Sequence, residues 1–221
     1  MTTRKQSTLF NRAKQSLVLL FSFGALMACQ AQTTAYELDP SKYQTVTSEF
    51  AVSTGDKIEV AELFWFKCGH CYALEPTLKK WEEGKPDNAE LVKVPAIFSA
   101  RWEFEAQAFY AMQALNAPQE AYDAYFHRIH VQKKYINNVS ALTEFLSEYG
   151  FAADQVESAF NSFAVDTNMR NAKKISIASG ATGVPAIIVD GKYLTSVTHA
   201  GSTQEMFKVV DQLVKKAAAE R

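Results

Sequence analysis

The chain has 221 residues, of which 48% are hydrophobic and 12% aromatic. This length and composition are enough to bury the core of one large domain or of a domain with an insertion, and they exclude wholesale disorder. The 23 basic and 24 acidic residues give a net charge of −1, so nothing points to nucleic-acid binding. Three cysteines, Cys29, Cys68 and Cys71, are too few for a disulfide-rich scaffold or a four-thiolate zinc site.

The first 31 residues have the layout of an export signal. Basic residues at positions 4, 5, 12 and 14 precede an apolar or small stretch over 17–28, and no acidic residue occurs before Glu37. That stretch is shorter than the roughly 20 residues that cross a bilayer as a helix, which favours a cleaved leader over a membrane span. We therefore predict a signal peptide over 1–31. Its removal leaves 19 basic and 24 acidic residues, a net charge of about −5.

The end of this leader allows two interpretations of Cys29. The residues Leu26-Met27-Ala28 before it are similar to a bacterial lipoprotein box, in which the cysteine becomes the lipidated first residue of the mature chain. Alternatively, an ordinary signal peptidase cuts after Ala31 or Ala35 and Cys29 is discarded. We favour the first interpretation, in which a lipid on Cys29 anchors the protein to the membrane.

After a polar lead-in with one short strand near 43–47, the residues 58–66 read IEVAELFWF. This run is rich in β-branched and aromatic side chains and is apolar on both faces, which predicts a central strand. Cys68-Gly69-His70-Cys71 follows directly, and a helical pattern over 72–81 comes next. Pro76 lies inside this helix, where we expect a kink.

A second strand is predicted over 90–98, and the pattern is then helical from 101 to about 179. Ser140 and Asp154 are expected N-caps within this block. Four helices are predicted, over 103–115, 118–130, 141–149 and 153–179.

The end of the chain returns to strands. A β-hairpin is predicted from strands over 187–189 and 192–195 and the Asp190-Gly191 turn. A last helix begins at Ser202, with Glu205 as its capping-box partner, and extends to the lysines at 215 and 216. The economical architecture is an α/β domain split into 36–100 and 180–221, with an all-helical domain over 101–179 inserted in it.

The Cys68-Gly69-His70-Cys71 motif carries the clearest chemistry. Two cysteines separated by two residues at a helix start can close a small disulfide ring, with the first sulfur exposed. Free amides and the helix dipole there stabilise a thiolate, which lowers the pKa of Cys68 from about 8.5 toward roughly 3.5–7.5, and a protonated His70 adds to this effect. A stabilised thiolate means a stabilised reduced form, so the disulfide form is an oxidant.

Two other interpretations of the motif are weaker. A structural disulfide closing such a short loop gains little loop entropy. A zinc half-site needs two further ligands, and His127, His130 and His199 show no paired spacing close to another thiol. Redox activity is therefore favoured.

These residues resemble the DsbA family of periplasmic thiol:disulfide oxidoreductases, within the thioredoxin superfamily. The resemblance covers nearly the whole mature chain and is carried by the run from Glu62 to Tyr72, the helical insertion, Thr182-Gly183-Val184-Pro185-Ala186 and the hairpin from Val189 to Tyr193. It implies an α/β thioredoxin fold with an inserted all-helical domain. It also implies a cis peptide bond before Pro185, opposite the CxxC motif, with Val184 setting redox behaviour and substrate contact. The family usually has Pro-His between the cysteines, whereas this chain has Gly69-His70, as in protein disulfide isomerases.

Charged residues near the motif match the family's charge network. Glu62 has the strand parity of Ile58 and Val60, so its side chain is predicted to be buried, where a lone carboxylate is costly unless it is paired or protonated. By resemblance it shuttles the proton as the thiols react. Glu75, two helical turns after Cys68, and Lys93 on the next strand match the rest of this network; alternatively, they form a solvated surface pair of little value.

We therefore expect a monomeric thiol:disulfide oxidoreductase in the periplasm that donates a Cys68–Cys71 disulfide to reduced exported proteins through a mixed disulfide on Cys68. By resemblance it uses no cofactor beyond this disulfide and is reoxidised by a DsbB-type membrane partner. Two alternatives stay open. One is a disulfide isomerase or reductase with the same site, although the chain has no spare segment for a dimerisation domain. The other is a non-enzymatic envelope binding protein whose CxxC is structural or holds a metal.

Overall fold

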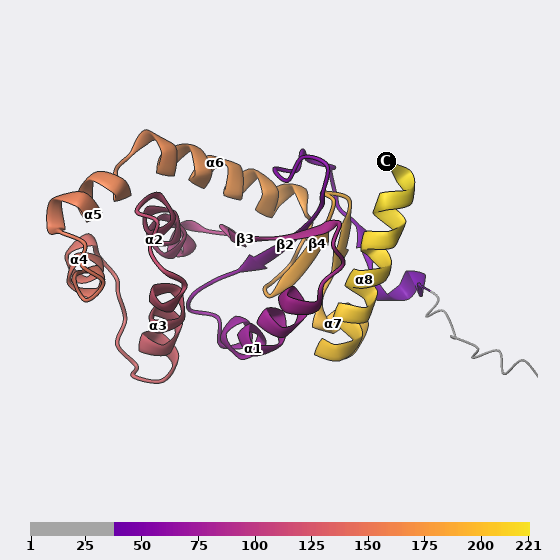
Figure 1. Ribbon diagram of the computed structural model, residues 1–221, viewed down its shortest axis with the longest axis horizontal. Coiled ribbons are helices and arrows are strands. Elements are labelled where there is room, and N and C mark those ends of the chain that lie inside the picture. The colour runs from indigo at the N-terminus through magenta and orange to yellow at the C-terminus, as the bar shows by residue number, and fades with distance from the viewer. Residues whose placement is uncertain (1–37) are drawn as a thin grey trace, which may run out of the picture. The chain divides into compact units, whose positions relative to one another are not determined.

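The computed structural model describes residues 38–221 (Figure 1). The predicted signal peptide over 1–31 and Cys29 lie outside the described residues. Among the helices of residues 38–221, none is both long enough and apolar enough to cross a membrane.

A mixed sheet of five strands forms the centre of the fold, in the order β1-β5-β4-β2-β3. The central strand β2 (Ile58–Phe64) is buried along its whole length and pairs in parallel with β3 (Ala89–Pro95) and antiparallel with β4 (Ala186–Val189). The hairpin strand β5 (Tyr193–Thr195) continues the sheet to the short β1 (Gln44–Thr45). Segments before residue 100 and after residue 180 therefore build one sheet.

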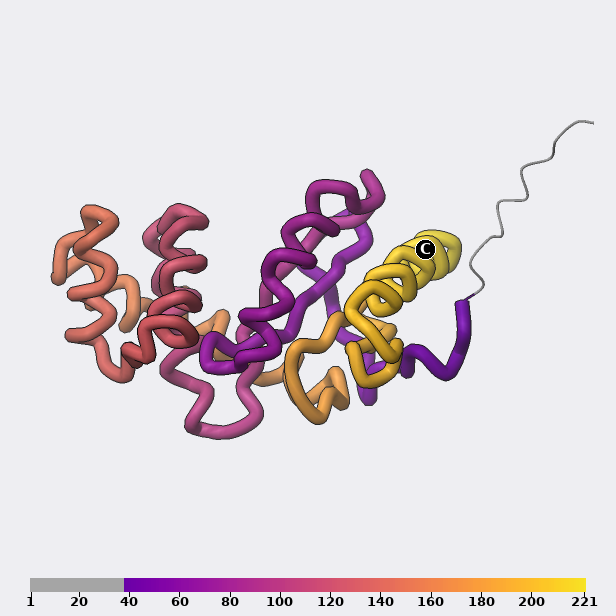
Figure 2. Tube along the Cα trace, turned by 90° about the horizontal axis from the view of Figure 1, so that it is seen from below, coloured from indigo at the N-terminus to yellow at the C-terminus, as the bar shows by residue number. Residues whose placement is uncertain are grey.

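Helices cover both faces of this sheet. On one face, α1 (Gly69–Gly84), α7 (Val197–Ala200) and α8 (Thr203–Glu220) pack on Ile58 and Val60 of β2 (Figure 2). The side chains of Ala61 and Leu63 point to the opposite face of β2 and belong to the larger apolar core there. The expected alternation of side chains along a strand thus divides the core in two.

The segment between β3 and β4 is helical and gathers at one end of the sheet (Figure 1). It packs through aromatic and aliphatic side chains, among which Tyr125, Met112 and Phe145 are almost fully buried. A last helix of this segment returns the chain to β4. Its helices are α2 (Glu103–Ala114), α3 (Gln119–His130), α4 (Val139–Ser147), α5 (Ala153–Phe160) and α6 (Phe163–Ala178). Two short 3-10 helices, η1 (Pro40–Lys42) and η2 (Ala100–Trp102), precede β1 and α2.

The helix predicted over 153–179 is wrong as one unit, because α5 ends at Phe160 and α6 starts at Phe163. Ser162 caps the new helix, since its hydroxyl accepts a hydrogen bond from the Val165 N–H at 3.2 Å. The apolar periodicity continues across the break, but the side-chain cap competes with the continuing helix.

Both N-caps expected in the helical segment are also wrong. Asn138, two residues before Ser140, caps α4 by accepting from the Ala141 N–H at 2.9 Å. Ala152 takes the N-cap place of α5, and Gln155 accepts from its N–H at 2.9 Å. The structure begins α4 two residues earlier than predicted, an ordinary uncertainty at helix boundaries, whereas α5 begins at Ala153 as predicted and only its cap differs.

The helix that carries the CxxC motif also differs from its prediction. It begins at Gly69 instead of 72, and it stays helical through Pro76 to Gly84. At the other end of the chain, Ser202 caps α8 as predicted, by accepting from the Glu205 N–H at 3.1 Å. The Glu205 carboxylate pairs with Lys42 and Lys208, and α8 continues beyond the lysines to Glu220.

Candidate active site at the start of α1

Cys68 is the N-cap of α1, directly after the turn that leaves β2. Its Sγ accepts a hydrogen bond from the Cys71 N–H at 3.2 Å, as a side chain at an N-cap is placed to do. Cys68 is half-buried, whereas Cys71, one turn along, is fully buried; both thiols are free. The motif thus offers one accessible sulfur with a second behind it.

The two thiols have opposite pKa shifts. Hydrogen bonding from the Cys71 thiol is the main effect that lowers the pKa of Cys68, to about 6, with help from the Cys71 and His70 backbone amides and the His70 charge. Burial raises the pKa of Cys71, and the neighbouring Cys68 sulfur raises it further. At neutral pH the reduced site therefore holds a thiolate at Cys68 and a protonated thiol at Cys71.

A loop from the distant part of the chain faces this thiolate. The Val184–Pro185 peptide bond is cis, as the resemblance implied, and the Val184 carbonyl oxygen lies 3.5 Å from Cys68 Sγ. A groove of about 590 Å³ runs beside this loop. Its walls include His70 and Leu74 from α1, residues 180–186, Leu194, and Val197 and His199 from α7.

Behind the motif lies a group of buried charges. Glu62 is fully buried on β2, and its Oε2 lies 3.3 Å from Lys93 Nζ on β3; Lys93 also forms an ion pair and hydrogen bond with Glu75 of α1. Burial raises the pKa of Glu62 to about 7, against the opposing charge of Lys93. Burial also opposes the charge of Lys93, but Glu62 and Glu75 hold its pKa above the ordinary value.

Glu75 is 8% exposed. The alternative of a solvated Glu75–Lys93 surface pair is therefore wrong. The structure brings the predicted site residues together: Cys68, Gly69, His70 and Cys71 in one turn, Val184 and Pro185 beside them, and the three charged residues behind.

A match to a known protein family shows which proteins share this site. A DSBA-like thioredoxin domain matches residues 59–213, from β2 through α8 and so through every element of the site. The chain belongs to this family.

Relatives of the DSBA-like family extend over nearly the whole sequence. The chain is 34% identical over 203 residues to the thiol:disulfide interchange protein DsbA of Pseudomonas aeruginosa, covering 92% of this chain and 96% of that one. It is 33% identical over 190 residues to DsbA of Azotobacter vinelandii, covering 83% and 89% of the two chains. A crystal structure of P. aeruginosa DsbA has a TM-score of 0.76 and 36% identity, covering 82% of this chain and 95% of that one.

The family membership and thioredoxin fold with a helical insertion, both expected from the sequence, are thus confirmed. As a DSBA-like protein the chain is a thiol:disulfide oxidoreductase. The metal-holding alternative for the CxxC finds no support in the described part of the chain, because no three His, Cys, Asp or Glu side chains of residues 38–221 are arranged to hold a metal ion.

A second group of polar residues, not predicted from the sequence, surrounds the turn before Cys68. Lys67 Nζ lies 2.5 Å from Oε1 of Glu105, a buried residue of α2. Trp65 donates to the other oxygen of this carboxylate, and His130 of α3 contacts the Phe66 carbonyl. The only sequence signal was the position of Glu105 on the apolar face of its helix, since Phe109 and Met112 follow at helical spacing.

Proposed function

We propose that the protein is a dithiol oxidase: it donates a Cys68–Cys71 disulfide to reduced exported proteins. The observation that supports this most directly is the stabilised Cys68 thiolate, whose pKa of about 6 lies well below that of an ordinary thiol. A stabilised thiolate favours the reduced form of the pair, so the disulfide form gives up its bond readily.

The proposed reaction runs through two exchange steps. A substrate thiolate attacks Cys68 Sγ of the disulfide, a bond forms between the two sulfurs, and Cys71 leaves as a thiolate that takes up a proton. A second substrate thiolate then attacks the substrate sulfur of this mixed disulfide. Cys68 leaves as the stabilised thiolate, the substrate is oxidised by two electrons, and the protein's pair is reduced.

Glu62 is proposed as the proton donor and acceptor for Cys71. Its charge contributes to the raised pKa of Cys71, which indicates that the two groups interact. A carboxyl group with a pKa of about 7 can both give and take a proton at neutral pH. Lys93 and Glu75 are proposed to set that pKa, since both act on the Glu62 charge.

Val184 and Pro185 are proposed to hold the substrate segment. The Val184 carbonyl oxygen is 3.5 Å from Cys68 Sγ, so an extended chain that reaches the sulfur also passes the Val184 backbone. Main-chain hydrogen bonding of this kind accepts many sequences, because it reads the backbone and not the side chains.

The setting of this reaction is proposed from the sequence and the family. The export signal over 1–31 supports a periplasmic location, with a lipid on Cys29 as the proposed anchor. A DsbB-type membrane protein is the proposed oxidant that regenerates the disulfide, with no further cofactor required. The protein is proposed to act as a monomer. Its proposed domains are an α/β domain formed by 36–100 and 180–221 and a helical domain over 101–179.

A redox titration tests the proposal. Equilibrium with glutathione gives the potential of the pair, and thiolate absorbance gives the pKa of Cys68. A potential near about −120 mV supports the oxidase, one near −180 mV supports an isomerase, and one below about −300 mV supports a structural disulfide. We expect Cys68→Ser to abolish oxidation of a dithiol peptide; activity in that variant would contradict the proposal.

The isomerase alternative keeps one observation in its favour, the Gly69-His70 dipeptide. Gly69 is the first residue of α1, where proline is well tolerated, and a Cβ added there meets no atom within 4 Å. The amides that lower the pKa of Cys68 belong to Cys71 and His70, so Gly69→Pro removes neither. We expect Gly69→Pro to keep a thiolate at pH 7 and to stabilise the fold by about 0.5–1 kcal/mol; thermal unfolding and thiolate absorbance measure both.

A further inference from the structure

The helical segment contacts the turn that leads into Cys68 at three successive residues, Trp65, Phe66 and Lys67. The Cys68 N–H donates to the Trp65 carbonyl at 2.9 Å and so closes the turn. Within it, the Phe66 carbonyl accepts from His130 Nε2 at 2.7 Å, and Lys67 Nζ donates to Asn137 Oδ1 at 3.1 Å. The position of Cys68 therefore depends on side chains of α3 and of the loop that follows it.

Glu105 is the one carboxylate that contacts this turn from α2. Its side chain is 1% exposed; Oε1 lies 2.5 Å from Lys67 Nζ, and Oε2 accepts from Trp65 Nε1 at 3.1 Å. An ionised carboxylate at this depth needs a charged partner, since an unpaired one costs several kcal/mol. Lys67 supplies that charge.

We propose that Glu105 is a positioning residue that sets the charge near Cys68: by pairing with Lys67, it holds the ammonium group toward α2 and away from the thiolate of the next residue. The pair thereby limits how strongly the reduced form is stabilised, and so limits the oxidising strength of the site. This inference rests on the proposed role of Cys68 as the reacting sulfur.

The surroundings of the two groups support this assignment. The groups that act on Cys68 are the Cys71 thiol and amide, the His70 amide and charge, and burial; Lys67, although adjacent in sequence, is not among the principal ones. The Glu105 charge also acts on the buried Tyr125 hydroxyl, which has no hydrogen-bond partner: burial, together with this charge, raises the pKa of Tyr125 well above 10. Within residues 38–221, Glu105 forms no other ion pair.

Glu105→Gln tests the assignment, because glutamine keeps the shape and the acceptor for Trp65 but loses the charge. With its charge no longer neutralised by Glu105, the Lys67 ammonium favours the thiolate, and we expect the midpoint of thiolate titration to fall by about half a pH unit. At pH 7 this corresponds to about a threefold change in the equilibrium constant with glutathione, toward the reduced protein.

Two further variants make the test specific. Adding Lys67→Met to Glu105→Gln removes the ammonium, and we expect both the midpoint and the equilibrium constant to return to the values of the unchanged protein. Glu103→Gln is the matched control, because Glu103 lies on the same helix but its side chain is 47% exposed and pairs with Lys173 at 3.6 Å. We expect it to leave the Cys68 titration unchanged.

Three results would overturn the inference: no shift or an upward shift in Glu105→Gln, a shift that persists in the double variant, or an equal shift in Glu103→Gln. If Glu105→Gln does not fold, Lys67→Met alone decides: with an uncompensated carboxylate left behind, its midpoint must not fall below that of the unchanged protein. The proposed function fails separately, if Cys68→Ser still oxidises dithiols.

Discussion

Cys68 and Cys71 lie in the same helical turn, yet their environments differ enough to give them different chemistry. The Cys68 sulfur receives the hydrogen bonds of the helix start and retains contact with solvent, whereas Cys71 lies in the core. Because the pKa of Cys68 is about 6 in the fold and about 8.5 when unfolded, the thiolate stabilises the reduced protein fully above pH 8.5. That stabilisation is lost as the pH falls toward 6.

Glu62 has the opposite relation to pH. Its pKa in the fold, about 7, lies above its ordinary value of 4.5, so the fold favours the protonated form. The resulting loss of stability is absent below pH 4.5, grows between pH 4.5 and 7, and is complete above pH 7. We expect Glu62→Gln to raise the free energy of unfolding by about 1–3 kcal/mol at pH 8 and to change it little at pH 4, as measured by urea unfolding at both pH values.

Glu59 provides the control for this prediction, since it lies on the same strand and is also buried. Its carboxylate, however, accepts hydrogen bonds from the Ser53 N–H and hydroxyl, both at 2.7 Å. Glu59→Gln weakens these charge-assisted bonds, so we expect a loss of stability at pH 8. A loss of stability at pH 8 in Glu62→Gln as well would contradict the prediction.

The sequence could predict the burial of Glu62 but not the role of Glu105. Alternation along a strand of apolar residues places Glu62 with Ile58 and Val60, and this was enough. Helical spacing could have predicted the burial of Glu105, but its partner Lys67 lies on a distant turn. Such a pairing depends on how α2 packs beside that turn, which no local pattern contains.

At the scale of elements, helix starts were the least predictable feature. The apolar spacing correctly predicted a helix at α4, but several polar residues near its start can serve as the cap. Asn138 does so, because its extended backbone, with φ −154° and ψ 165°, directs the side chain at the first free amides. The choice between Asn138 and Ser140 is made by the path of the preceding loop, which the sequence pattern does not specify.

A pair of alanine substitutions tests this cap. Asn138→Ala leaves the Ala141 N–H without its acceptor and is expected to lower the free energy of unfolding by about 1 kcal/mol. Ser140→Ala, within the first turn of α4, is expected to change it by less than about 0.5 kcal/mol. Urea unfolding measures both, and a larger loss in Ser140→Ala would return the cap to the residue first predicted.

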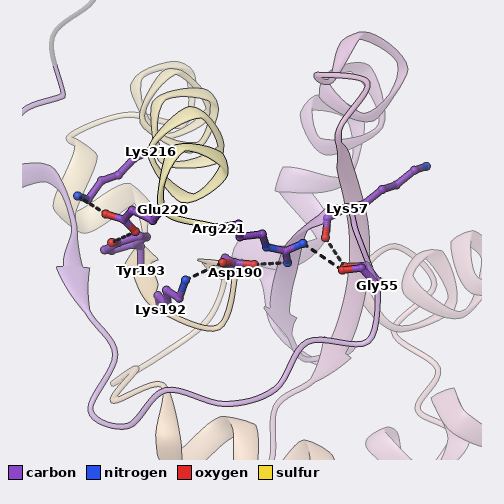
Figure 3. Close-up of polar contacts among 9 residues, drawn as sticks. Gly55, Lys57, Asp190, Lys192, Tyr193, Lys216, Glu220 and Arg221 are labelled. Carbon is purple, nitrogen blue, oxygen red and sulfur yellow. Dashed lines mark hydrogen bonds and ion pairs between the residues drawn. The ribbon is translucent and has the colours of Figure 1, made fainter.

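At the scale of the molecule, the sequence predicted the α/β fold class well, because the strand-forming segments on both sides of the helical insertion are strongly patterned. IEVAELF reads as a strand buried on both faces, and Asp190-Gly191 reads as a hairpin turn. The contacts that join the end of the chain to the sheet were not predictable, because they are single side-chain pairings between distant segments. Figure 3 shows them: Arg221 reaches the Gly55 carbonyl and the carboxylate of Asp190.

Asp190 is the centre of this contact. It is 5% exposed and has a positive φ of 55°, and Lys192 and Arg221 bind its two oxygens at 3.0 and 2.5 Å. Removing one partner of a buried carboxylate leaves its charge less compensated. The Lys192 ammonium remains in such a variant, so the loss is smaller than for an isolated buried pair.

We therefore expect Arg221→Met to lower the free energy of unfolding by about 1–2 kcal/mol, because it removes both the Asp190 ion pair and the hydrogen bond to Gly55. Lys57→Met is the control, since Lys57 and Glu90 are each about half exposed and their 3.4 Å pair contributes less than about 0.5 kcal/mol. Urea unfolding of the two variants measures the difference. Equal effects would show that Arg221 forms only a surface contact, with the hairpin turn held by Lys192 alone.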